Sequence, residues 1–219
     1  MIAPEYSSEN LLAYYNCRME ITQIADYIGE TGSAYAYLAI PSNSLKEHIT
    51  KLLLELRSDI GPGLYAMPKE ALHITLCEIF QAKDYSQDKQ HLFDMSRKAF
   101  EDIPADILKH FSPIKIIFNK IEASPYAIII RGEDDGSFKK IRKQLLKRLP
   151  IPLETKAPPD IIHISIARFT ERLDLTTVGK LAGRHSINQE EIIQDFRLIH
   201  TTVFPFNQYS TIRKYPLSK

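Results

Sequence analysis

The 219-residue chain has no tryptophan, only two cysteines and eight scattered glycines. Cys17 and Cys77 form no Cys-x-x-Cys pair, so neither a disulfide framework nor a zinc knuckle is indicated. The dispersed glycines do not make the glycine-rich loop that cradles phosphates in P-loop enzymes, and no His-Glu-x-x-His string offers zinc ligands. These absences disfavour the common metalloenzymes and P-loop nucleotidases. We therefore expect no metal and no organic cofactor.

The net charge is also small: 28 lysines and arginines nearly balance 27 acidic residues, so the formal net charge is +1. Such a weak overall field disfavours extended DNA binding, whereas a nucleotide or an RNA end remains a suitable partner. No apolar run approaches the roughly 20 residues that span a bilayer. The first residues lack the basic and apolar regions of a signal peptide. We expect a cytoplasmic monomer without membrane contact.

Two short strings stand out against this background: Leu72-His73-Ile74-Thr75-Leu76 and Ile162-His163-Ile164-Ser165-Ile166. Successive side chains of a strand point to opposite faces, so each string places a histidine and a hydroxyl on one face. A single string of this kind is ordinarily the wet face of a half-buried strand, since histidine is intermediate in burial preference. Two matching strings in one chain favour a shared site instead.

The surroundings of the two strings repeat as well. A strand from Ala34 to Ile40 and an amphipathic helix precede His73, and a strand from Pro125 to Ile130 and a helix precede His163. The distances along the chain are 39 and 38 residues. This pattern predicts an internal duplication with a pseudo-twofold axis that brings the histidines face to face. The expected fold is α+β, with two lobes of mainly antiparallel sheet flanked by helices and a central cleft holding one motif from each lobe.

The paired motifs resemble the two-histidine (2H) phosphoesterase superfamily, whose signature is two apolar-flanked His-x-Thr/Ser strings roughly a hundred residues apart. The spacing here is 90 residues, and the resemblance covers residues 34 to 217, including the closing segment Phe196 to Leu217. It implies one bilobal domain over residues 34–219. Residues 1–33 lie outside it and are predicted to be a helical extension, with helical spacing from Ser8 to Ile28.

The resemblance implies a phosphodiesterase that acts on 2′,3′-cyclic phosphates or on 2′-5′ linked or terminal phosphodiesters of nucleotides and RNA. The residue types suit this chemistry, because two imidazoles supply the base and the acid of an in-line displacement. The hydroxyls donate to the phosphate oxygens, and such a site requires no metal. The predicted catalytic residues are His73, Thr75, His163 and Ser165; which histidine is the acid stays open.

Three further residues are predicted to bind substrate: Arg168, Tyr37 and Tyr126. Arg168 suits a phosphate, although strict alternation turns it away from the His163 face unless the strand bends. The tyrosines are candidates for base stacking, together with Tyr35, Tyr65 and Tyr209. Cys77 shares the His73 face by the same alternation and is expected to line the cleft rather than act as a nucleophile.

Two patterns are predicted to lie outside the site. Ile199-His200-Thr201 is a third His-x-Thr string, but no strand and helix unit precedes it, so we interpret it as structural. The helix from Ser137 to Leu149 carries six basic residues that are expected to form a solvated face, or else to guide RNA: Lys139, Lys140, Arg142, Lys143, Lys147 and Arg148. The alternative function is a non-catalytic nucleotide- or RNA-binding module. Incubation with 2′,3′-cyclic nucleotides in chelator distinguishes the two, because such a module would not open the ring.

Overall fold

The computed structural model describes residues 28–81, 88–155, 158 and 160–218. The helix predicted over Ser8 to Ile28 lies outside the described residues except for its last position. The strands are β1 (Thr31–Ala39), β2 (Leu64–Ala66), β3 (Ile74–Phe80), β4 (Ile114–Ala123), β5 (Ala127–Glu133), β6 (Ile162–Phe169), β7 (Gln189–Ile193), β8 (Asp195–Val203) and β9 (Gln208–Pro216). The helices are α2 (Asn43–Ile60), the 3-10 turn η1 (Lys69–Ala71), α3 (Lys89–Leu108), α4 (Ser137–Arg148) and α5 (Leu175–Ala182).

The strands form two antiparallel sheets with matching order. One sheet runs β3-β1-β8-β9, and the other runs β2-β6-β5-β4-β7. Apart from the short β2, each sheet has the strand of one motif, then the strand that precedes it in the predicted repeat, then two further strands. The predicted α+β fold of antiparallel sheets flanked by helices is confirmed, and the equivalent strand orders agree with the predicted duplication.

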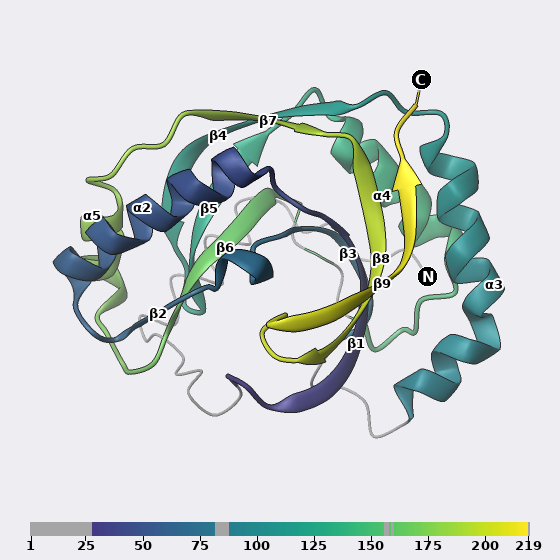
Figure 1. Cartoon of the computed structure of the whole chain (residues 1–219), viewed down its shortest axis with the longest axis horizontal. Coiled ribbons are helices and arrows are strands. Elements are labelled where there is room, and N and C mark those ends of the chain that lie inside the picture. The colour runs from purple at the N-terminus through teal and green to yellow at the C-terminus, as the bar shows by residue number, and fades with distance from the viewer. Residues whose placement is uncertain (1–27, 82–87, 156–157, 159, 219) are drawn as a thin grey trace.

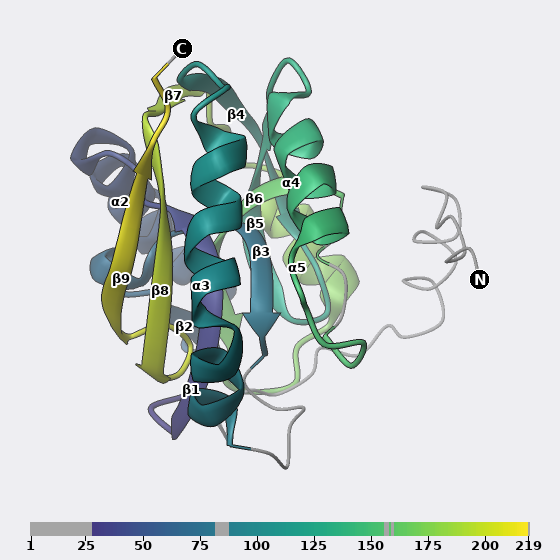
Figure 2. The same ribbon diagram turned by 90° about the vertical axis from the view of Figure 1, so that its right-hand side faces the viewer.

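The two halves of the chain exchange elements (Figure 1). Helix α2 follows β1 in the sequence but contacts β2 and β6 of the five-stranded sheet, where it packs beside α5. Helix α4 follows β5 but contacts β3 of the four-stranded sheet and lies beside α3. Figure 2 shows α3 and α4 side by side over this second lobe. Each sheet is therefore covered by one helix from each half.

Hydrophobic spacing and capping explain α2. Its buried side chains recur every three or four residues: Leu45, Ile49, Leu52, Leu53 and Leu56. The Ser42 hydroxyl accepts a hydrogen bond from Leu45 N at 3.3 Å and so caps the first turn. The helix ends at Ile60. It stops before Gly61, whose φ of 100° suits a residue without a side chain.

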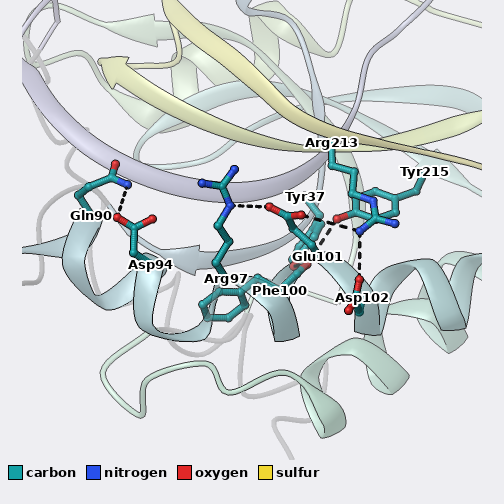
Figure 3. Close-up of polar contacts among 9 residues, drawn as sticks. All are labelled: Tyr37, Gln90, Asp94, Arg97, Phe100, Glu101, Asp102, Arg213 and Tyr215. Atoms are coloured by element: carbon teal, nitrogen blue, oxygen red, sulfur yellow. Dashed lines mark hydrogen bonds and ion pairs between the residues drawn. The ribbon is translucent and has the colours of Figure 1, made fainter.

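The face of the four-stranded sheet that meets α3 is sealed by polar contacts as well as by packing (Figure 3). The hydroxyls of Tyr37 and Tyr215 both donate to Phe100 O, at 2.6 and 3.4 Å. At the edge, Arg213 forms an ion pair with Asp102 at 3.2 Å. This is the helix-covered face, and Thr75, which lies opposite Leu38 rather than Tyr37, belongs to the other face of this sheet. No helix among the described residues is long and apolar enough to cross a membrane.

Candidate active site

The first motif strand contains a β-bulge that alternation alone does not predict. In the pairing of β1 with β3, Leu38 lies opposite Thr75 and Tyr37 lies opposite Cys77. Leu76 is therefore an extra residue without an opposite partner. A bulge of this kind shifts the inside and outside positions by one for the residues that follow it, here up to a second irregularity between Glu78 and Phe80.

The shift decides the place of the residues that follow. Glu78 lies opposite Ala36 and joins the face that carries Thr75, which we call the motif face. Cys77 turns to the helix-covered side, where it is fully buried, and burial raises the pKa of its thiol to about 12. The prediction that Cys77 shares the His73 face is wrong, because the bulge falls between the two.

The second motif strand has a bulge at the equivalent position. In the pairing of β5 with β6, Ile129 lies opposite Ser165 and Ile128 lies opposite Ala167, so Ile166 is the extra residue. The bulge follows the motif hydroxyl directly, as it does in β3. The two strands thus share a backbone irregularity as well as a residue pattern.

This second bulge supplies the bend that Arg168 required. Arg168 lies opposite Ala127, on the same face as Ser165 and His163. Its Nη1 donates to the carbonyl of Tyr126 at 3.4 Å, which places the turn between β4 and β5 beside it. The structure therefore brings Arg168 to the motif face of the five-stranded sheet, with the Tyr126 carbonyl beside it, and the Tyr126 side chain is exposed.

Both histidine rings are held in the same way. His73 Nδ1 lies 2.7 Å from Ala71 O, the carbonyl two residues earlier, and the His163 ring has a backbone hydrogen bond with Ile161, again two residues earlier. A carbonyl only accepts, so Nδ1 of His73 carries the proton and Nε2 is the basic nitrogen of the neutral ring. The bond leaves Nε2 of His73 for a reacting group.

The two imidazoles share one electrostatic environment. Burial lowers the pKa of His73 and of His163 to about 4, and the positive charge of Arg168 acts in the same direction on both. A charge on His163 also lowers the pKa of His73. Since β3 and β6 are in contact, the structure brings the two predicted motifs together across the two lobes.

The turn between β8 and β9 also lies beside His73. The sequence analysis did not predict that its residues belong to the site. The Phe206 ring lies 4.4 Å from the His73 ring, centroid to centroid, on a backbone with φ of 65°, which is rare for a bulky residue. The next residue, Asn207, donates from Nδ2 to the Tyr65 hydroxyl at 3.1 Å. Tyr65 lies opposite Arg168, so this turn connects the two lobes at the site.

The geometry can be compared with known proteins. Residues 41–198 match the family model of the 2′-5′ RNA ligase superfamily, which is more than half of the chain. The chain belongs to the 2′-5′ RNA ligase superfamily. The predicted 2H phosphoesterase resemblance is thereby confirmed, and its two motifs lie within the matched residues. None of the curated proteins compared matches the chain significantly in sequence.

Solved structures share the fold of this superfamily member at low identity. TT0787 of Thermus thermophilus is 16% identical with a TM-score of 0.59, over 84% of this chain and 97% of its own. Apo LigT of E. coli is 10% identical with a TM-score of 0.59, over 87% and 100%. Usb1 of Kluyveromyces marxianus, solved with uridine monophosphate, is 11% identical with a TM-score of 0.51, over 85% and 99%.

Two predicted tyrosine contacts do not reach the motif face in this superfamily member. Tyr37 is fully buried with its hydroxyl on Phe100 O, so the prediction that it binds substrate is wrong. Tyr35 is also buried on that side and stacks on His200 at 4.5 Å. The His200 ring bonds to the Ser33 hydroxyl at 2.8 Å, which agrees with the structural role predicted for the third His-x-Thr string.

The described part of the chain has another cavity but no cluster of metal-ligating side chains. No group of three or more His, Cys, Asp or Glu residues there has the arrangement of a metal site. A cavity of about 660 Å³ lies between the α3–β4 connection and the start of α4, and neither motif lines it. Its Asp134 carboxylate is already occupied as the cap of α4, accepting from Phe138 N at 2.7 Å. The motif faces are therefore the place where the two histidines, the two hydroxyls and Arg168 come together.

Proposed function

We propose that this protein is a metal-independent phosphodiesterase that acts on a 2′,3′-cyclic or 2′-5′ type phosphodiester of a nucleotide or RNA end. The observation that carries the proposal is the pairing of His73 with His163. Each ring is fixed through a carbonyl two residues earlier, each is followed by a hydroxyl on the same face, and both lie in the field of Arg168.

The displacement follows from these positions. One imidazole takes a proton from water as its oxygen bonds to phosphorus, and the other gives a proton to the sugar oxygen as the opposite P–O bond breaks. Thr75 and Ser165 donate hydrogen bonds to the nonbridging oxygens, and the Arg168 guanidinium offsets their negative charge. Product release and proton exchange with solvent restore the two rings.

Because the pKa values of both histidines are low, the bound substrate itself promotes protonation of the imidazole that acts as the acid. Near neutral pH both rings are neutral in the free site, because burial and Arg168 disfavour the imidazolium. A bound phosphodiester brings a negative charge, which raises the pKa of the ring nearest the leaving oxygen. The acid is thus protonated mainly when substrate is present.

Solved relatives support the substrate class. LigT of E. coli has been solved with 3′-AMP, with phosphate and with ATP, and Usb1 has been solved with uridine monophosphate. We extend this nucleotide class to the present chain as part of the proposal. The sequence identities of 10–11% between these proteins and this chain carry the fold alone.

The same pKa values favour one second candidate, a nucleotide- or RNA-binding module without turnover, because the free site holds no imidazolium at neutral pH. The test is incubation with four 2′,3′-cyclic nucleotides and a 2′-5′ dinucleotide in chelator, followed by chromatography. We expect ring opening or cleavage that His73→Ala and His163→Ala each slow by about 10²–10⁴-fold. Binding of a 3′-nucleotide without turnover of any substrate would establish the module instead.

A further inference from the structure

From a buried position, Arg142 contacts the first motif and the residue directly before the second. It lies on α4 and its exposed fraction is only 6%. Its Nε donates to Leu76 O at 2.8 Å, and its Nη2 donates to Thr75 O at 3.2 Å and to Ile161 O at 3.3 Å. The prediction that Arg142 belongs to a solvated basic face is therefore wrong.

Two of these carbonyls belong to the bulge of the first motif. A bulge disrupts the ladder locally, so its carbonyls need donors from elsewhere. Arg142 supplies them for Thr75 and Leu76. At the second bulge, Ile166 O accepts from Met67 N at 2.9 Å, a backbone donor from the first half of the chain. Each bulge is thus closed by a donor from the opposite half.

The third carbonyl lies directly before the second motif. Ile161 is the residue whose backbone holds the His163 ring by a hydrogen bond. Arg142 Nη2 donates to the same residue's carbonyl. One guanidinium therefore connects the strand segment of Thr75 with the group that sets the orientation of His163.

Arginine suits this position better than lysine. A buried charge is costly unless several hydrogen bonds satisfy it, and a rigid planar fork reaches separate acceptors that a single ammonium does not. The Phe138 ring lies 5.0 Å below the guanidinium carbon and fills the remaining space. The positive charge also contributes to the lowered pKa of His163, after burial and Arg168.

We propose that Arg142 is a positioning residue for the proposed reaction: its guanidinium fixes the first motif's bulge and the Ile161 carbonyl together, and so sets the two imidazoles relative to each other. The inference rests on the proposed function, because the groups that it positions are the proposed acid and base. It adds a buried cation that donates to backbone carbonyls at the first motif and directly before the second.

The test uses three variants of the whole protein: Arg142→Lys, Arg142→Met and the control Lys143→Met, whose lysine is the exposed neighbour. Arg142→Lys keeps the charge but loses the fork, so we expect kcat on the cyclic nucleotide to fall about 10–100-fold with KM little changed. Arg142→Met also removes the charge, so the pKa of His163, followed by NMR of the ring, rises in this variant alone. Lys143→Met leaves both quantities unchanged.

Circular dichroism and thermal unfolding identify the folded variants, and kinetics are measured well below each midpoint. Unchanged kcat and unchanged ring titration in both Arg142 variants would overturn the proposal. Failure of both variants to fold would overturn it too, since Arg142 would then serve the fold as a whole. If the wild-type protein turns over no substrate, the proposed function fails, while the ring spectra of His73 and His163 in Arg142→Lys still decide the positioning role.

Discussion

Glu78 and Arg168 occupy equivalent positions in the two halves of the molecule, each three residues beyond its motif hydroxyl and each brought to the motif face by a bulge. Their opposite charges break the pseudo-symmetry of the site. Glu78 accepts a hydrogen bond from Gln81 Nε2, and Arg168 donates to Tyr126 O. A phosphate is therefore favoured on the Arg168 side and disfavoured on the Glu78 side.

The first prediction concerns this asymmetry. Arg168→Met should weaken binding of a 3′-nucleotide by about tenfold or more, since a charge-assisted contact with phosphate is lost, and Glu78→Gln should strengthen it. Isothermal titration calorimetry measures both. Lys147→Met, a change of one positive charge on the exposed side of α4, is the control. Equal weakening in Lys147→Met and Arg168→Met would show that only the overall charge matters.

The second prediction ranks the motif residues by turnover. His73→Ala and His163→Ala should each lower kcat by about 10²–10⁴-fold, with the double variant scarcely worse. Thr75→Val and Ser165→Ala should cost up to about 10²–10³-fold.

The control for this ranking is His200→Ala, which should cost little because that ring lies against Tyr35 on the helix-covered face. A loss in His200→Ala as large as in His163→Ala, with the fold intact, would contradict the assignment of the second motif.

The third prediction is the pH dependence of stability. The pKa of both histidines is about 4 in the folded protein and near 6.5 when unfolded, so between these values the unfolded chain binds more protons. The free energy of unfolding should therefore be highest above about pH 6.5 and fall as the pH is lowered toward 4. Urea titrations across this range measure it.

His73→Gln is the matched variant for that measurement, because it removes one titrating group from the site. Its stability should fall less steeply between about pH 6.5 and 4 than that of the wild type. Saturating inorganic phosphate should also flatten the wild-type curve, because the anion favours the imidazolium in the folded state. A slope that neither change alters would mean that the motif histidines titrate at their ordinary pKa.

The fourth prediction is the pH dependence of activity in chelator. The pKa values in the free site govern kcat/KM, so its maximum should lie on the acid side of 6.5 and the value should fall as the pH rises further. The maximum of kcat should lie at higher pH, since the bound phosphodiester raises the pKa of the acid. Loss of activity in EDTA that zinc or manganese restores would contradict the two-histidine chemistry.

Much of this fold and site follows from the sequence. The repeated strings and their surroundings predicted both motif strands, the strands that precede them and the contact of the two halves. The sequence analysis also stated that Arg168 can reach the His163 face only if the strand bends, and the bulge at Ile166 is that bend. Alternation predicts such features wherever a strand stays regular and one face is buried.

The errors have separate physical causes. Cys77 was misplaced because a bulge depends on donors from distant residues, Arg142 among them, which local alternation does not contain. Tyr37 belongs to a strand that is buried on both faces, so its face is decided by α3 and not by polarity. Arg142 did have a signal: it lies four residues after Phe138 and three before Leu145, within the apolar stripe of its helix. Phe206 reaches His73 only through the backbone path of the turn between β8 and β9, which local alternation does not contain.

The exchange of elements between the halves makes the two lobes dependent on each other. Residues up to Ala123 contribute α2 and β4 to the lobe of the five-stranded sheet. Residues from Ala127 contribute α4 and β8 to the lobe of the four-stranded sheet. Each half also closes the other's bulge, through Met67 N and through Arg142. Neither half of the chain therefore builds a complete sheet or closes its own motif bulge without the other.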